Sequence, residues 1–491
     1  MRPSVRLVFA AALGAASVLA FAPFAFFPLA ALTLAGLFVL LRGRSPKQAA
    51  ATGFAFGAGW FGVGTSWVFV SLSVFGGLPP LLAGIATALF CGVLALFPAL
   101  AAWCLARWQP AGPIAQALRF AGIWTLAEWL RSWLFTGFPW LSLGYSQTPP
   151  SPFAGYAPLF GVYGMSLAVA LFAALAAGVV VQRTTRGRAV AALLAAALVA
   201  VGAGLRGIPW SAPQGAPVSV ALLQGNIEQD LKWRPERFSD SMRVYAALMA
   251  THPAQLTVLP ETAVPAFLDQ VPPEYLLRFK EHGEARHGDV LFGVAAGDGR
   301  QYANAAVSLG VSPSQIYAKS HLVPFGEFVP FGFQWFLDLM RIPMGNFTAG
   351  PDRQQPLEIA GQKVAVNICY EDAFGSEIVR ALPEATLLVN LSNTAWFGDS
   401  LAQPQHLQIA QIRALETGRP MLRATNTGMT GVVRADGTVQ AVLPPFVRDA
   451  LVAEVQGHAG TTPYVRWGNL PVVLGSLLLL LATGARRRQR V

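Results

Sequence analysis

One cysteine stands out in the polar part of this chain. Cys369 closes the β-branched run 364–368 and is followed, after Tyr370, by two acidic residues. The other cysteines, Cys91 and Cys104, lie in an apolar segment. A lone thiol in a polar domain fits a nucleophile for acyl transfer. A small, buried hydrophobic side chain at a strand end is the competing interpretation, so the residues around Cys369 must decide.

Two further strand ends carry groups that complete this chemistry. Glu261 ends the run 256–260, and Lys319 ends the run 315–318. A carboxylate can take the thiol proton and later return it, while an ammonium group lowers a thiol pKa and stabilises an oxyanion. Taken singly, such charges are more often solvated. Together with Cys369, at strand ends that can meet at one sheet edge, they predict a site for acyl transfer.

The elements that must position these residues lie between residues 208 and 465. Short β-branched runs bounded by turn residues alternate there with helical patterns such as 238–250 and 403–417. About 250 residues of mixed strands and helices predict one α/β domain with a substantial core. The segment 209–217, rich in Pro and Gly, predicts a linker before it.

The rest of the chain is apolar. The chain as a whole is 54% hydrophobic and 12% charged, with a mean hydropathy of +0.47. Its apolar stretches are long enough to span a bilayer. We place eight spans near residues 6–22, 24–41, 49–74, 80–106, 115–135, 158–181, 189–206 and 468–485. The sequence therefore predicts an α-helical membrane bundle formed by residues 1–207 and 466–491.

The charged residues are distributed unevenly. Residues 1–207 contain 12 Lys/Arg and one acid, whereas residues 208–465 contain 18 Lys/Arg and 24 Asp/Glu. The net charge of +10 therefore does not describe one basic surface, and we expect no nucleic-acid partner. The positive-inside rule places the Lys/Arg-containing loops and both termini in the cytoplasm. The uncharged loops and the polar domain then lie outside.

Three features of the spans have two interpretations each. Glu128 and Arg131 share a helix face, and they fit either a structural ion pair or a contact to lipid headgroups. The uncharged aromatic loop 137–147 fits interfacial anchoring or a lipid-facing portal. Glycines in the third span favour close helix packing, with a kinked wall for lipid entry as the alternative. These glycines are Gly53, Gly57, Gly59, Gly62 and Gly64.

The motifs around Glu261, Lys319 and Cys369 resemble those of the nitrilase superfamily, whose Glu-Lys-Cys triad sits on an αββα sandwich. The whole chain, with the polar domain inserted before the last span, resembles the bacterial apolipoprotein N-acyltransferase family. Four segments extend the resemblance: QGNIEQDLKW (224–233), KSHLVPFGEFV (319–329), NLSNTAWFG (390–398) and RATNTG (423–428).

The resemblance implies a role for each matching residue. Glu261 would be the general base, Cys369 the nucleophile and Lys319 the cation that stabilises the oxyanion. Glu327 and Glu371 match acids that the family keeps near the site, where they would orient Lys319 or relay protons. A purely structural salt bridge is the alternative for both acids.

Four further residues are expected to support the reaction. The N–H of Tyr370 follows the nucleophile on the turn and would be a second oxyanion donor. Trp233 and Asn393 fit the shaping of an acyl pocket, with core packing as the alternative. The run 331–340 contains Trp335 and is unusually apolar for an aqueous domain. We expect it to be a mobile arm at the membrane interface, with core burial as the alternative.

The family's reaction explains this layout. A phospholipid, typically phosphatidylethanolamine, would acylate Cys369, and the thioester would then acylate the N-terminal amine of a diacylated apolipoprotein. The resemblance implies a monomer in the bacterial inner membrane, with residues 208–465 forming a periplasmic catalytic domain. No cofactor is implied, and the scattered histidines and missing phosphate-binding loop predict neither a metal nor a nucleotide.

Three other functions share part of this evidence. A membrane-tethered nitrilase-type amidase acting on small amides would use the same triad but would not need the preceding spans. A transporter with an appended domain predicts charges or broken helices near the midplane, and only Glu128 and Arg131 qualify. A non-catalytic scaffold would tolerate Cys369→Ala. The sequence favours the acyltransferase.

Overall fold

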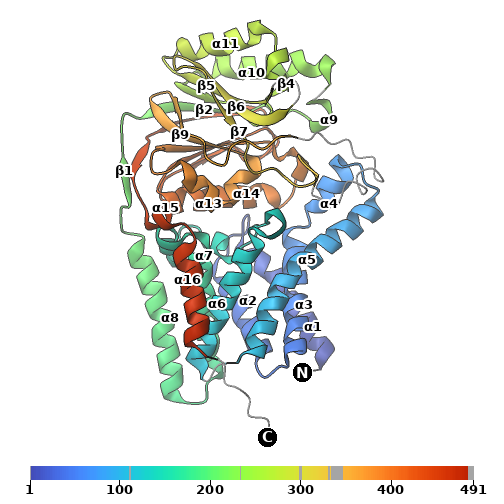
Figure 1. Cartoon of the computed structure of the whole chain (residues 1–491), viewed down its shortest axis with the longest axis vertical. Coiled ribbons are helices and arrows are strands. Elements are labelled where there is room, and N and C mark those ends of the chain that lie inside the picture. Colours follow the sequence, from blue (N-terminus) through green and yellow to red (C-terminus); the bar gives the residue numbers. More distant parts are fainter. Residues whose placement is uncertain are drawn as a thin grey trace. The chain divides into compact units, whose positions relative to one another are not determined.

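The computed structural model describes residues 2–109, 112–232, 234–297, 301–329, 332 and 347–484. The chain folds into two compact units (Figure 1). The helical unit comprises Met1–Phe69, Pro80–Pro209 and Arg466–Val491, and the sandwich unit comprises Val70–Pro79 and Trp210–Val465.

The helical unit contains one helix near each predicted span. These helices are α1 (Pro3–Ser17), α2 (Pro28–Leu41), α3 (Pro46–Gly64), α5 (Pro80–Arg107), α6 (Pro113–Arg131), α7 (Ala157–Val181), α8 (Thr185–Leu205) and α16 (Leu470–Ala482). Among the described residues, four segments are long and apolar enough to cross a membrane: Pro3–Ala20, Pro80–Arg107, Pro152–Val181 and Thr185–Leu205. The protein is therefore a membrane protein, and its helices match the predicted spans approximately.

The third predicted span is not one straight helix. It consists of Pro46–Gly64 followed by Val68–Phe75, and the two parts are bent by 59° relative to one another. The second part ends in the π-helical turn η2 (Ser71–Phe75). Within the sandwich unit, the Ser71 hydroxyl donates to the Trp396 carbonyl at 2.7 Å, and the Phe75 ring meets the Trp396 ring edge-on. This turn is thus held by the polar domain's own residues.

The glycines of α3 allow neighbouring backbones to approach closely. A Cβ atom on Gly59 would lie 2.0 Å from the Ala11 carbonyl oxygen of α1. A Cβ atom on Gly57 would lie 2.8 Å from the Ala95 Cα of α5. A Cβ atom on Gly62, by contrast, would meet nothing within 4 Å. Close helix packing is therefore confirmed for Gly57 and Gly59.

Gly59→Ala is expected to destabilise the helical unit by about 1–3 kcal/mol, because the added methyl group forces α1 and α3 apart. Gly62→Ala is the matched control. It is expected to be neutral or to stabilise by up to about 1 kcal/mol, through helix propensity alone. The thermal unfolding midpoints of the two variants in detergent test this difference. Equal midpoints would show that α1 and α3 do not need this contact.

The aromatic loop predicted for the membrane interface is instead buried inside the helical unit. Residues 140–147 are buried throughout, and Trp140 is 0% exposed. Glu128 accepts a hydrogen bond from the Leu143 N–H at 3.0 Å, and Arg131 donates to the Trp140 carbonyl at 2.7 Å. Interfacial anchoring is thus the wrong interpretation for residues 140–147. The two charged side chains have a structural role, because both hold this segment in place.

Two sheets form the centre of the sandwich unit. The first runs in the order β14 (Asp449–Val455), β2 (Val218–Gln224), β3 (Leu256–Val258), β5 (Asp289–Gly297), β6 (Tyr302–Gly310) and β7 (Gln315–Ala318), with β4 (Val264–Phe267) beside β5. The second runs β13 (Val439–Val442), β12 (Gly431–Val433), β11 (Met421–Thr425), β10 (Leu387–Ser392), β9 (Gln362–Ile368) and β8 (Leu357–Ile359). The central strands are parallel in each sheet: β2, β3 and β5, and β9, β10 and β11.

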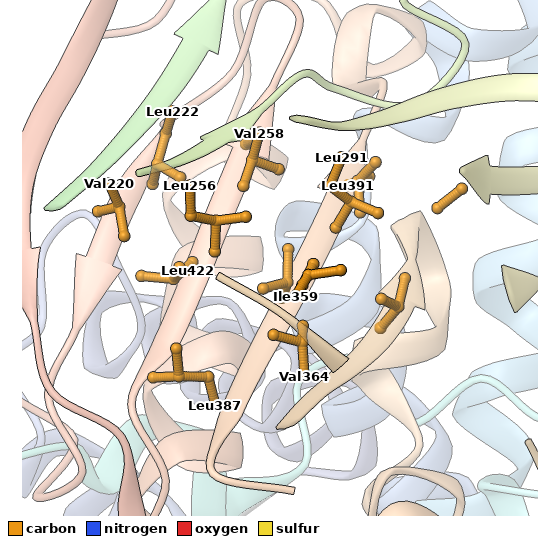
Figure 2. Packing of buried hydrophobic residues seen from close by; sticks show 14 of the residues in the cluster. Val220, Leu222, Leu256, Val258, Leu291, Ile359, Val364, Leu387, Leu391 and Leu422 are labelled. Atoms are coloured by element: carbon orange, nitrogen blue, oxygen red, sulfur yellow. The ribbon is translucent and has the colours of Figure 1, made fainter. Parts of the chain in front are cut away.

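The main core lies between the two sheets. Leu222 and Leu256 of the first sheet belong to the same apolar cluster as Ile359, Leu387 and Leu422 of the second (Figure 2). Helices α10 (Phe238–Thr251) and α11 (Pro273–Glu284) cover the outer face of the first sheet. Helices α13 (Gly375–Ile378) and α14 (Ala402–Thr417) cover the second. The predicted αββα sandwich is confirmed, and its parallel strands can bring several strand ends to one edge.

Candidate active site

The sandwich unit brings the three predicted catalytic side chains to one buried location. Glu261 follows β3, Lys319 follows β7 and Cys369 follows β9. The Lys319 Nζ lies 3.9 Å from Glu261 Oε1, and the charges of both residues act on the Cys369 thiol. The exposed fractions of Glu261, Lys319 and Cys369 are 7%, 1% and 9%. A carboxylate, an ammonium group and a thiol therefore share one site that is largely shielded from water.

Cys369 sits on a sharp turn between β9 and the short helix η8 (Cys369–Ala373). Its φ of +55° is a left-handed conformation that few non-glycine residues adopt. The Asn390 Nδ2 donates to the Cys369 carbonyl at 3.0 Å, and the Ile368 N–H donates to Glu371 at 2.7 Å. These contacts hold the turn on both sides. The N–H of Tyr370 is then the next main-chain donor after the nucleophile.

The thiol is not ionised by its surroundings. Burial raises the pKa of Cys369, and the charges of Glu261 and Glu327 raise it further. Lys319 and Arg423 lower this pKa, but the result stays well above the ordinary value for cysteine. Lys319 thus lowers the thiol pKa, as expected. The other effects raise it by more, so the net shift is upward, against the expectation. A nucleophile of this kind needs a base to remove its proton.

Glu261 is placed as such a base would be. Its Oε1 accepts a hydrogen bond from the Asn304 Nδ2 at 2.7 Å, and its Oε2 accepts one from the Asn393 N–H at 2.7 Å. Asn393 was expected to shape an acyl pocket. Its side chain donates to Gln229 at 2.6 Å, and its main chain orients the carboxylate. The sequence reasoning missed Asn304, because a single polar residue inside β6 gives no signal of its own.

Lys319 is held in its charged form. Glu327 contacts the Lys319 Nζ at 2.8 Å, and Asn304 and the Val323 N–H also donate to Glu327. Burial lowers the pKa of Lys319, but Glu327 and Glu261 outweigh burial and raise it above the ordinary value for lysine. The lysine is therefore a permanent cation, which suits oxyanion stabilisation and not proton transfer.

Glu371 joins the chain after β7 to the turn of the nucleophile. One carboxylate oxygen accepts hydrogen bonds from the N–H groups of Ser320 and His321, at 2.7 and 3.0 Å. The other accepts from the Ile368 N–H and from the Tyr317 hydroxyl. Such a set of donors satisfies a buried carboxylate. It is the arrangement that an orienting role requires, since both strand ends are fixed by one side chain.

A buried ionic network that the sequence reasoning did not assign lies behind the nucleophile. Asp372 binds His406 at 2.7 Å and Arg423 at 2.8 Å. Arg423 also donates to Asn390 at 2.7 Å, and Asn390 holds the Cys369 carbonyl. The only signal in the sequence was Arg423 at the start of the RATNTG segment. Two other predicted residues, Trp233 and Trp335 in the run 331–340, lie outside the described residues.

Comparisons with known proteins agree with both units. Residues 13–175 match the family described as apolipoprotein N-acyltransferase N-terminal domain, and residues 219–464 match the carbon-nitrogen hydrolase family. A membrane protein that carries a carbon-nitrogen hydrolase domain is thus the class that fold and site define. The chain is 49% identical to an apolipoprotein N-acyltransferase of Nitrosomonas europaea, over 98% of this chain and 99% of the relative. The chain belongs to the apolipoprotein N-acyltransferase family.

Other relatives have the same relationship to this chain. The apolipoprotein N-acyltransferase of Ralstonia nicotianae is 47% identical, over 99% of this chain and 95% of the relative. Among solved structures, a CN-hydrolase superfamily protein from Xanthomonas campestris is 16% identical, with a TM-score of 0.38 over 53% of this chain and 97% of that chain. A structural similarity of this size adds nothing to the family assignment, which rests on the sequence matches.

Proposed function

We propose that this protein is a phospholipid:apolipoprotein N-acyltransferase that works through a thioester at Cys369. The observation that supports this most directly is the buried cluster of Glu261, Lys319 and Cys369 at the strand ends of the sandwich. The near full-length similarity to N-acyltransferases supplies the reaction class. The amidase alternative is not favoured, because it gives no reason for the apolar helices that make up the other unit.

In the first half-reaction, the Cys369 sulfur attacks the ester carbonyl of a phospholipid while Glu261 takes the thiol proton. The negative charge that develops on the carbonyl oxygen is stabilised by Lys319 and by the N–H of Tyr370. When the tetrahedral intermediate collapses, Glu261 returns the proton to the departing lysophospholipid oxygen. The acyl chain is left on the sulfur as a thioester.

In the second half-reaction, the N-terminal amine of a diacylated apolipoprotein attacks the thioester. Glu261 takes a proton from the attacking amine and passes it to the departing Cys369 sulfur, so an amide forms and the thiol is restored. Glu327 keeps Lys319 in position, and Glu371 keeps the two strand ends together. Trp233, Asn393 and Trp335 retain their proposed role as substrate contacts.

The proposed location follows from the charges in the sequence. The charges of the Lys/Arg-containing loops favour cytoplasmic termini and a periplasmic domain at residues 208–465, between membrane segments 1–207 and 466–491. Phosphatidylethanolamine is the proposed donor, and a monomer is the proposed functional form. Both substrates are anchored in the bilayer, so a catalytic domain tethered to apolar helices meets them at the membrane surface.

An intact-mass measurement tests the first half-reaction. Purified protein incubated with phosphatidylethanolamine, without an acceptor, should gain the mass of one acyl chain and lose it in neutral hydroxylamine. Cys369→Ala should gain nothing, whereas Cys104→Ala, the control thiol, should behave like the wild type. A diacylated lipopeptide should then discharge the adduct. An adduct that survives in Cys369→Ala, or turnover of soluble amides without lipid, would contradict the proposal.

A further inference from the structure

A second lysine is buried beside the proposed catalytic residues. Lys232 is the last residue of the short helix α9 (Gln229–Lys232) and is 1% exposed. Its Nζ donates a hydrogen bond to the main-chain carbonyl of Glu261 at 3.0 Å. A buried ammonium group is costly unless nearby groups compensate its charge. Its contact with the main chain of the proposed base therefore calls for an explanation.

The segment that carries Lys232 is fixed to both sheets. After β2, the Ile227 N–H donates to Asn426 at 3.0 Å, and the Asn426 side chain donates back to the Ile227 carbonyl at 2.8 Å. Further along, Gln229 accepts a hydrogen bond from the Asn393 side chain. Asn393 is the residue whose main chain also orients Glu261. Asn393 thus joins the segment that carries Lys232 to the carboxylate of Glu261.

The charges around the proposed catalytic residues explain why a buried lysine is useful there. Three buried carboxylates, Glu261, Glu327 and Glu371, act on the single ammonium group of Lys319. The neighbouring Arg423 is already paired with Asp372. These four carboxylates face two cations, and Lys232 reduces the excess of negative charge from two to one. Removing its charge would therefore leave a more negative pocket, in which a thiolate is harder to form.

We propose that Lys232 is a positioning residue of the acyl-transfer reaction, which holds the main chain of Glu261 and adds a positive charge, beside those of Lys319 and Arg423, that helps Cys369 lose its proton. This inference rests on the proposed function. When the proton passes from the Cys369 sulfur to Glu261, the negative charge moves from the carboxylate to the sulfur. The charges of Lys232, Lys319 and Arg423 then all stabilise the thiolate.

The acid–base behaviour of Lys232 makes the inference testable. Burial lowers the pKa of Lys232 to about 8, against the opposing effects of Glu261 and Cys369. The side chain is therefore charged at neutral pH and becomes neutral within an accessible alkaline range. Below about pH 8, the charge of Lys232 should stabilise the Cys369 thiolate. Above that pH, Lys232 is neutral and this stabilisation should be lost.

Alkylation of Cys369 measures this directly in the full-length protein. Cys91→Ala and Cys104→Ala remove the other thiols, and iodoacetamide labelling is followed by mass at a series of pH values. Lys232→Gln retains a donor for the Glu261 carbonyl but no charge, and Lys232→Met retains neither. Both should react about tenfold more slowly than the lysine-containing protein at neutral pH, as a thiol pKa one unit higher requires. The difference should disappear above about pH 8.

A control variant and a second measurement complete the alkylation test of Lys232. Lys280→Gln changes an exposed lysine of α11, whose ammonium lies 3.7 Å from Glu284, and should alter nothing. Thermal unfolding midpoints establish that the Lys232 variants are folded. If a folded variant has the wild-type profile, or is slower by the same factor at every pH, the inference is overturned. The protein that retains Lys232 supplies a second measurement, since its rate should stop rising with pH near 8. An unbroken rise would also overturn the inference.

These outcomes are independent of the proposed function, because alkylation requires no lipid. A protein whose Cys369 is alkylated as expected but never takes up an acyl chain would contradict the proposed acyl transfer. A protein that forms the thioester, but whose Lys232 variants keep the wild-type alkylation profile, would contradict the role of Lys232 alone.

Discussion

Glu261→Gln is expected to slow formation of the acyl-enzyme by about 10²–10⁴-fold, the usual contribution of a positioned general base. Burial and the nearby carboxylates hold the pKa of the Cys369 thiol well above its ordinary value, so almost no thiolate forms unaided. Glutamine keeps the shape of the side chain and can still accept the hydrogen bond from the Asn393 N–H. What it loses is the ability to take a proton. Rapid-quench intact mass with phosphatidylethanolamine measures the rate.

Two comparisons separate loss of the base from loss of structure. Glu284→Gln changes an exposed carboxylate of α11, and its acylation rate should equal that of the wild type. The rate of Glu261→Gln should recover as pH rises, because hydroxide replaces the missing base. A rate within threefold of the wild type would mean that another group deprotonates Cys369. A defect that does not change with pH would point to a distorted site.

Arg423→Met should have the largest effect on stability, with a loss of about 3–5 kcal/mol from the free energy of unfolding. Arg423 is 1% exposed and pairs with Asp372, which is 0% exposed, at 2.8 Å. Methionine fills much of the volume but leaves the carboxylate buried without its cation. Denaturant unfolding followed by circular dichroism gives the change, and Arg434→Met, at an exposed position, is the control.

A double variant shows whether the loss comes from the uncompensated charge. Arg423→Met combined with Asp372→Asn should be less destabilised than the sum of the two single variants, because neither then buries a lone charge. Strict additivity would show that the two side chains contribute separately. Since Arg423 also holds Asn390, and Asn390 holds the Cys369 carbonyl, the single variant should lose acylation activity as well.

The three proposed catalytic residues could be found from the sequence because each ends a strand pattern. The expectation that they meet at one sheet edge was wrong, because Glu261 and Lys319 follow strands of the first sheet and Cys369 follows a strand of the second. Asn304 could not be found in this way. It lies inside β6, where it faces Ala295 of β5 in an antiparallel pair, and its contacts with Glu261 and Glu327 depend on how the strand ends fold back.

The burial of Lys232 and the burial of the loop 140–147 could not be predicted from the sequence, for two different reasons. Lys232 follows the acid Asp230 in a polar segment, so composition suggests a solvated lysine, and only tertiary contacts show that it is buried. The loop is uncharged and aromatic, as a segment at a membrane interface also is. It is held in place by the Leu143 N–H, which donates to Glu128, and by Arg131, which donates to the Trp140 carbonyl, and the sequence permits these contacts without requiring them.

The turn η2 has a consequence for how the chain matures. Its Ser71 is synthesised 325 residues before the Trp396 that it binds, and both belong to the same compact unit. The sandwich unit is therefore incomplete until η2, which lies in sequence between two apolar helices, binds the later segment that contains Trp396. Closing so long a loop adds little entropy cost beyond that of a shorter one. The early position of η2 in the chain matters more, because a fragment that starts at residue 210 lacks η2 and cannot form this part of the sandwich unit.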